Sequence, residues 1–105
     1  MSLKIKNLPH EEFFSKRFQT VKTPYFLLKT KKNGDIWGRF GVVAGKSAGK
    51  TAVKRNFLKR QARETLFKEL IPGNDVLIIF SRGAGDVTKK GIKEELVGAI
   101  KSAQK

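Results

Sequence analysis

The residues from Thr51 to Leu70 contain neither glycine nor proline, and Pro72-Gly73 follows them almost at once. An uninterrupted stretch of this length, closed by such a pair, predicts a long helix. The next segment, 75–80, reads DVLIIF and is nearly all apolar, which predicts a strand that is central in a sheet or buried on both faces. A long helix that leads directly into a buried strand restricts the chain to folds in which helices cover a sheet.

Shorter segments complete this pattern. Asn33-Gly34 is a turn signal typical of β-hairpins, because both central residues of such a turn tolerate positive φ. A chain of 105 residues suffices for one small domain. We therefore expect a single domain over residues 1–105, an α/β (α+β) two-layer sandwich with the order α-β-β-β-α-β-α. The expected elements are a helix over 10–19, strands over 21–23, 25–32 and 36–45, the helix over 51–70, the strand over 75–80 and a helix over 87–103.

Charge is the most unusual property of the composition. Lysine and arginine number 23 against 9 acidic residues, which gives a formal net charge of +14. A compact domain with this charge attracts polyanions, and nucleic acid is the default partner. An anionic membrane is the weaker alternative, because little of the charge lies on an amphipathic helix with a clean apolar face. We expect a nucleic-acid partner and no membrane.

The residue types exclude several kinds of site. The chain has no cysteine, which removes disulfides, thiolate zinc sites and thiol nucleophiles together. Its one histidine, His10, cannot build a metal site by itself, and a surface position near the terminus is the simpler interpretation. No apolar run approaches the roughly 18 residues that span a membrane, and the N-terminus lacks the apolar core of a signal peptide. The simplest expectation is a cytoplasmic protein, and the sequence locates no metal site.

The segment 44–51, AGKSAGKT, ends as a nucleotide-binding phosphate loop does. However, Ala44 stands where the strict pattern requires its first glycine, and the apolar strand that follows does not end in the acidic residue that Mg²⁺-dependent hydrolysis needs. We therefore expect neither nucleotide hydrolysis nor an organic cofactor. Two interpretations stay open: a flexible basic turn, or a loop whose Lys46 and Lys50 contact RNA phosphates.

The long helix carries a strongly basic face. Arg55, Lys59 and Arg63 recur every four residues and so form a single stripe. Solvated helices usually mix the two signs of charge, so this asymmetry favours nucleic-acid binding over a merely solvated face. The segment from Lys50 to Arg63 contains no acidic residue, and its basic residues are Lys50, Lys54, Arg55, Lys59, Arg60 and Arg63.

The same helix has two sides with apolar residues. Leu58, Ala62 and Leu66 form a partly apolar side. We expect another side to meet the sheet, formed by Val53, Phe57, Phe67 and Ile71.

The sequence AVKRNFLKRQARE resembles the signature helix of the bacterial ribonuclease P protein subunit, whose pattern is Arg-Asn-Arg, then Lys-Arg, then Arg-Glu. Three further segments are similar to the family's strand and basic loop, its next strand and loop, and its first helix: RFGVVAGKSAGK, PGNDVLIIFSRGAG and FFSKRFQ. The resemblance thus covers most of the chain. One departure is Phe57, which stands where the family has its second arginine. The residues that match the helix pattern are Arg55, Asn56, Lys59, Arg60, Arg63 and Glu64.

The resemblance implies a protein that is not itself the catalyst. In that family the ribonuclease P RNA cleaves the 5′ leader from precursor tRNA with bound Mg²⁺, and the protein assists. For this chain it implies no catalytic residue, two partners (ribonuclease P RNA and precursor tRNA) and Mg²⁺ held through the RNA. It also implies a left-handed strand–helix–strand crossover, against the rule that nearly all such connections obey.

The resemblance also implies site residues. A cleft between the first helix and the sheet would hold the single-stranded leader, with Phe14, Phe18 and Tyr25 at cleft positions. Stacking on aromatic rings tolerates any base, but packing in the core is the competing interpretation for Phe14 and Phe18. The residues that would face the catalytic RNA are Lys54, Arg55, Asn56, Lys59, Arg60 and Arg63.

Two other classes of function compete with this interpretation. A general RNA-binding module, such as a ribosomal protein, would have the same charge and a similar fold. An autonomous enzyme, either a nucleotide hydrolase or a protein-only nuclease, would need clustered carboxylates or a histidine base. The nine acids of this sequence make no obvious inward set, which disfavours the enzyme.

Overall fold

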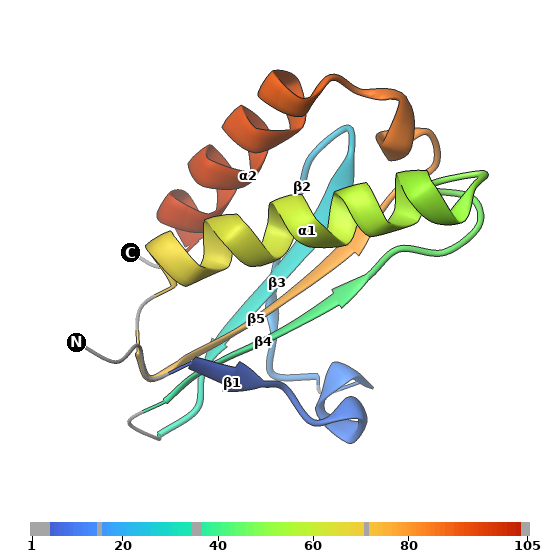
Figure 1. Cartoon of the computed structure of the whole chain (residues 1–105). Coiled ribbons are helices and arrows are strands. Elements are labelled where there is room, and N and C mark those ends of the chain that lie inside the picture. Colours follow the sequence, from blue (N-terminus) through green and yellow to red (C-terminus); the bar gives the residue numbers. More distant parts are fainter. Residues whose placement is uncertain (1–4, 15, 35–36, 71, 104–105) are drawn as a thin grey trace.

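The computed structural model describes residues 5–14, 16–34, 37–70 and 72–103 (Figure 1). The expected mixed fold, a sheet covered by helices, is confirmed. In chain order the elements are β1 (Ile5–Asn7), the 3₁₀ helix η1 (His10–Phe14), β2 (Gln19–Lys22), β3 (Phe26–Lys32), β4 (Gly38–Val43), α1 (Ala52–Glu69), β5 (Asn74–Phe80), the 3₁₀ helix η2 (Ala84–Asp86) and α2 (Lys89–Ala103).

The strands form one five-stranded sheet with the order β1-β4-β5-β3-β2. β5 runs parallel to β4 and antiparallel to β3, while β1 extends the sheet parallel to β4 and β2 extends it antiparallel to β3. Val76, Leu77 and Ile78 of β5 are all buried although successive residues point to opposite faces. The predicted central strand is therefore confirmed.

The hairpin predicted at Asn33-Gly34 is wrong. Gly34 has a positive φ of 70°, but Asn33 does not have a positive φ, and β3 and β4 are not neighbours. Leu77 of β5 pairs with Lys29 on one side and with Gly41 on the other, so β5 lies between the two strands. A strand that is apolar on both faces is stable only at the centre of a sheet. The turn residues between β3 and β4 carry no information that β5, which comes later in the chain, lies between these two strands.

The connection from β4 through α1 to β5 is left-handed. With α1 toward the viewer and both strands pointing upward, β5 lies to the left of β4 (Figure 1). This confirms the crossover that the family resemblance implied. It departs from the right-handed rule for parallel strand–helix–strand units, so no pattern within the sequence predicts it.

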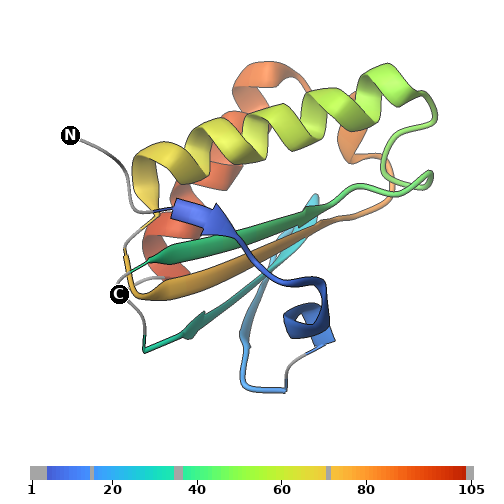
Figure 2. The same cartoon turned by 60° about the horizontal axis from the view of Figure 1, so that its bottom comes forward.

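Both long helices cover the same face of the sheet, while η1 lies on the other side (Figure 2). Leu58, Ala62 and Leu66 of α1 are fully buried in the core between these two layers. The expectation that the other apolar side meets the sheet is wrong for Val53, which is 77% exposed. Phe67 is 45% exposed, but its ring does meet Phe40 of β4. Phe57 is partly buried and packs against the core, and Ile71 lies outside the described residues.

The reason for this difference is the place of α2 beside α1. The buried face of α1 also includes Gln61 and Thr65, two polar residues that a hydrophobic pattern does not count. Their side of the helix lies between the sheet and the second helix, and this rotates the buried face away from Val53.

The N-terminal part differs most from expectation. The predicted helix over 10–19 is a 3₁₀ helix that ends at Phe14, and β2 already begins at Gln19. β1 was not expected at all, because three residues are too few for a periodic pattern. Both strands exist through pairing with distant segments: Ile5 pairs with Gly38, and Gln19 pairs with Thr30.

Candidate nucleic-acid interface

The predicted basic stripe of α1 reaches the outer face of the helix only in part. The helix begins after Thr51, whose side chain accepts a hydrogen bond from the backbone N–H of Lys54 at 3.2 Å, a common N-terminal cap. Because Leu58, Ala62 and Leu66 occupy the core side, the opposite side faces solvent. Asn56, Arg60 and Arg63 are exposed there, and Arg55 and Lys59 are half-buried on its flank.

The loop before α1, residues 44–51, is held on the protein by backbone contacts. Gly83 N–H donates to the carbonyl of Ser47 at 3.1 Å, and Gly85 N–H donates to that of Ala48 at 2.8 Å. A Cβ on Gly85 would lie only 3.0 Å from the Ala48 carbonyl oxygen, so a side chain there would separate the two loops. Arg55 adds a hydrogen bond from Nη1 to the carbonyl of Gly49 at 2.9 Å. These contacts hold the basic loop in place, which argues against the interpretation that it is a flexible turn.

This packing gathers cations from two loops. Lys46 and Lys50 are exposed and line a hollow of about 450 Å³ together with Arg82, which follows β5. Arg82 is not among the site residues predicted from the sequence. The signal was available, because β4 and β5 are parallel and the loops that follow parallel strands meet at one edge of a sheet.

Lys54 has a different environment from the other basic residues of α1. Its ammonium forms an ion pair with Asp86 of η2. The hydrogen bond and the charge of Lys54 lower the pKa of the Asp86 carboxyl. Lys54 therefore joins α1 to η2 and shares its charge with an acid, while Arg60 and Arg63 are presented outward.

The face of the sheet opposite the two long helices, the open face, carries a second cationic group. Lys31 donates to Glu12 of η1 at 2.7 Å and lies 3.7 Å from Asp75. Its Nζ also lies 5.1 Å from the centre of the Phe18 ring, within the range of a cation–π contact. The hydrogen bond and charge of Lys31 lower the pKa of Glu12.

Asp75 is the buried centre of this group. It is fully buried and accepts hydrogen bonds from Arg39 at 2.8 and 2.7 Å and from Asn33 at 2.8 Å. Burial raises its pKa, but these hydrogen bonds and the charges of Arg39 and Lys31 lower it more, so the pKa of Asp75 lies below its ordinary value. The carboxylate thus joins β3, β4 and β5 at one end of the open face.

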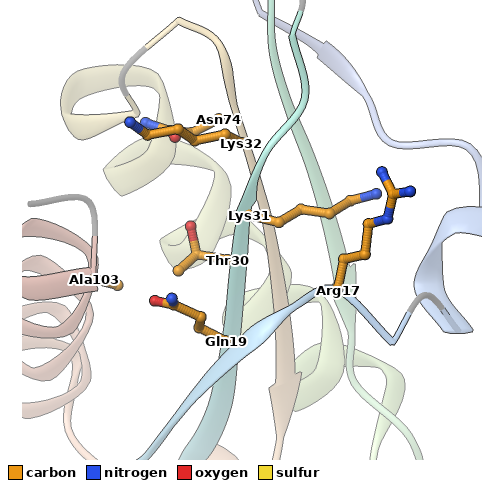
Figure 3. Close-up of a pocket in the computed structure, with 7 residues that line it drawn as sticks. All are labelled: Arg17, Gln19, Thr30, Lys31, Lys32, Asn74 and Ala103. Carbon is orange, nitrogen blue, oxygen red and sulfur yellow. The ribbon is translucent and has the colours of Figure 1, made fainter.

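A hollow of about 300 Å³ lies at the edge of the sheet next to this group. Figure 3 shows Arg17 and Lys31 on one side of β3, and Gln19 and Thr30 on the other side, toward Ala103 of α2. The open face at this end therefore combines two cations with the Phe18 ring. Such a surface suits the phosphates and base faces of a single strand.

The three aromatic residues expected in a leader cleft do not form one group. Phe18 lies on the open face. Tyr25 packs against the helix side of the core and lines a hollow with Glu94 and Ser102 of α2. The side chain of Phe14 lies outside the described part of the chain.

Phe13 is an aromatic residue of the open face that is not among the site residues predicted from the sequence. A Cβ built on Gly41 of β4 would lie 2.6 Å from the Phe13 ring, so the ring packs directly on bare backbone. The combination of an aromatic residue in η1 and a glycine in the strand beneath it is visible only in the fold.

Over residues 5–14, 16–34, 37–70 and 72–103, no three or more His, Asp or Glu side chains gather as a metal site would require. Over the same ranges no helix has the length and apolar character to cross a bilayer.

Comparisons with known proteins identify the family of this chain. A family model described as Ribonuclease P matches residues 6–104. The "Ribonuclease P protein component" of Limosilactobacillus fermentum is 32% identical over 97 residues, which cover 86% of this chain and 84% of that protein. The component of the same name from Ralstonia pickettii is 48% identical over 59 residues, but these cover 54% of this chain and only 42% of that protein. The chain thus spans less than half the length of the Ralstonia relative.

Solved structures match over nearly the whole chain. The Staphylococcus aureus RNase P protein superposes with a TM-score of 0.80 at 28% identity and covers 98% of this chain and 97% of that one. The Thermotoga maritima RNase P protein superposes with a TM-score of 0.76 at 24% identity, over 92% of this chain and 96% of that one. At that identity the second match supports the fold alone.

Proposed function

This chain belongs to the ribonuclease P protein family, and on that premise we propose that it is the RNA-binding, non-catalytic protein component of a ribonuclease P. It would bind ribonuclease P RNA and precursor tRNA and so assist removal of the 5′ leader. The observation that carries the proposal is the outer face of α1, where Asn56, Arg60 and Arg63 are exposed. The opposite side of the same helix is fully buried, so this face is held rigidly toward a partner.

Phosphate neutralisation supplies the affinity in this proposal. Each lysine or arginine that contacts a phosphate releases condensed counterions, so binding falls steeply as salt rises. The fixed loop with Lys46 and Lys50 lies at the N-terminal end of the same helix, and together with Arg82 of the loop after β5 it extends the cationic surface. The surface would thereby also reduce repulsion between two RNAs that must approach each other.

We assign the 5′ leader to the open face. Phe18 offers a ring for base stacking, and the exposed Arg17 offers a charge for phosphates. Lys31 is paired with Glu12 and Asp75 and lies against the Phe18 ring. Stacking contributes roughly 1–3 kcal/mol per base and does not depend on sequence. Leaders differ from one tRNA to another, which suits a surface of this kind.

Mg²⁺ enters this proposal only through the RNA. Since the described residues bring no three acidic or histidine side chains together, we assign no protein ligand to the ion. The Mg²⁺ supplies the cleavage chemistry when it is bound to the RNA, and the cations of this chain lower the amount of it needed to hold the RNAs together.

The test is cleavage of a precursor tRNA by a bacterial ribonuclease P RNA at low Mg²⁺, with and without the protein. We expect strong stimulation by the protein and no cleavage by the protein alone. The same Mg²⁺ requirement with and without the protein would contradict the proposal. If salt-sensitive RNA binding persisted without stimulation, the chain would be a general RNA-binding module.

Phe18→Ala tests the assignment of the leader. We expect the variant to bind precursor tRNA about tenfold more weakly in the complex with ribonuclease P RNA, because one stacked base is lost. Binding of mature tRNA, which has no leader, should be unchanged. Equal losses for both tRNAs would contradict the assignment, and circular dichroism would show whether the variant still folds.

A further inference from the structure

Phe67 is a large apolar side chain in an unusual place. It lies on the outer face of α1 and is 45% exposed. Its ring meets Phe40 edge to face, with centroids 5.9 Å apart and an interplanar angle of 72°. Phe40 is only 7% exposed and belongs to the core, so one edge of the Phe67 ring is fixed while the rest remains accessible.

The surroundings of the ring are polar. Phe67 borders a hollow of about 460 Å³ whose other lining residues are Asn56, Lys59, Arg60, Arg63 and Glu64. Arg63 precedes Phe67 by one helical turn, and side chains four residues apart lie next to each other on a helix. A single exposed apolar residue is ordinary on a protein surface. An aromatic face fixed by the core and bordered by arginines in a hollow is a more specific arrangement.

This arrangement matches the chemistry of an unpaired nucleotide. A ring can stack on a base, and a guanidinium can bind the phosphate attached to it. Phosphates alone would gain nothing from a phenyl ring. Bases within a duplex are stacked on each other and do not offer their faces.

We propose that Phe67 and Arg63 form a nucleobase-binding site on α1, in which an unpaired base of the partner RNA stacks on Phe67 and its phosphate pairs with Arg63. The inference rests on the proposed function, because it takes RNA as the partner of this face. It adds that the face selects RNA with an unpaired base at this point and does not bind by charge alone.

The first experiment measures binding of ribonuclease P RNA as a function of salt for four proteins: the parent, Phe67→Ala, Phe67→Trp and Val53→Ala. We expect Phe67→Ala to bind about tenfold more weakly at every salt concentration, with the same salt slope, since stacking involves no counterion release. Phe67→Trp should retain the affinity. Val53→Ala is the matched control, because Val53 is an exposed apolar residue of the same helix outside the hollow.

The second experiment places a local probe at the site. Phe67→Trp adds an indole to the one already present at Trp37, and the parent protein supplies the blank. An unstructured oligonucleotide should quench the added emission. A fully paired hairpin with the same number of phosphates, whose strands are joined by a non-nucleotide linker, should not.

The outcomes separate this inference from the proposed function. If the parent binds ribonuclease P RNA and Phe67→Ala binds it equally well, the nucleobase site is wrong and the proposed function stands. Equal quenching by the oligonucleotide and the hairpin would also overturn the site. If the parent binds no RNA, both fail together.

Discussion

Asp75→Asn is expected to lower the free energy of unfolding by about 3 kcal/mol, because removing one partner of a buried ion pair leaves the other uncompensated. The carboxylate is fully buried and accepts two hydrogen bonds from Arg39 and one from Asn33. An asparagine keeps the shape but loses the charge that Arg39 and Lys31 face. We place the loss at the low end of the range for buried pairs, since the Arg39 and Lys31 side chains are 17% and 11% exposed and keep some contact with water. Urea unfolding followed by circular dichroism measures it.

The same variant should change the response to acid. The pKa of Asp75 lies below its ordinary value in the folded protein, so the ionised carboxylate stabilises the fold at every pH above the ordinary carboxyl pKa of about 4. This contribution is lost as pH falls through the lowered pKa of the folded state. We therefore expect the stability of the parent to fall below about pH 4 and that of Asp75→Asn to depend less on pH in this window.

Asp86→Asn is the matched control for this prediction. It also removes a carboxylate that is paired with a lysine, but the Asp86 side chain is 62% exposed. Exposed pairs contribute little to stability, so we expect almost no shift of the urea midpoint. Equal destabilisation by the two substitutions would show that burial of Asp75 is not the cause.

The parts of the fold that the sequence predicted are those decided by local pattern. The predicted bounds of α1 and β5 agree with the observed bounds to within about one residue. A Gly- and Pro-free stretch and a continuous apolar run depend on neighbouring residues only. The hairpin, the buried side of α1 and the strand β1 were not predicted correctly. Each of them is decided by a distant segment: the insertion of β5, the packing of α2, and the pairing of Ile5 with Gly38.

The candidate site divides in the same way. The stripe on α1 could be predicted, since spacing along one helix fixes which residues share a face. Phe13 could not, because it joins its surface through Gly41, which lies far along the chain. The sequence pattern predicts Asp75 only as the first residue of an apolar strand. An acid at the edge of a buried run in so basic a chain was the available signal, because a buried carboxylate must find a cationic partner.

These contacts also decide which residues test the interface cleanly. Arg55 donates to the carbonyl of Gly49, and Lys54 pairs with Asp86. Replacing either would loosen the loop or η2 as well as remove a charge, so a loss of RNA binding could not be assigned to a phosphate contact. Arg60 and Arg63 are exposed on the outer face and are the better choice.

The double variant Arg60→Ala/Arg63→Ala is expected to bind ribonuclease P RNA about 25- to 60-fold more weakly near 0.1 M salt. Each phosphate contact adds about 0.7–0.9 to the slope of log K against log salt. If the two proteins bind equally at 1 M salt, the loss of two contacts gives this difference in affinity at about 0.1 M. The slope itself should fall by nearly two, and the two proteins should converge near 1 M salt. Filter binding over a salt series measures both quantities.

Lys89→Ala/Lys90→Ala removes the same net charge from exposed positions at the start of α2 and is the matched control. If the field of the whole protein drove binding, this control would lose as much affinity as the α1 variant, and the contact assignment would be wrong. If α1 makes the contacts, the control should lose only a few-fold, because charges beyond about 10 Å are screened at this salt concentration. The difference between the two double variants therefore measures how much of the affinity belongs to one face of one helix.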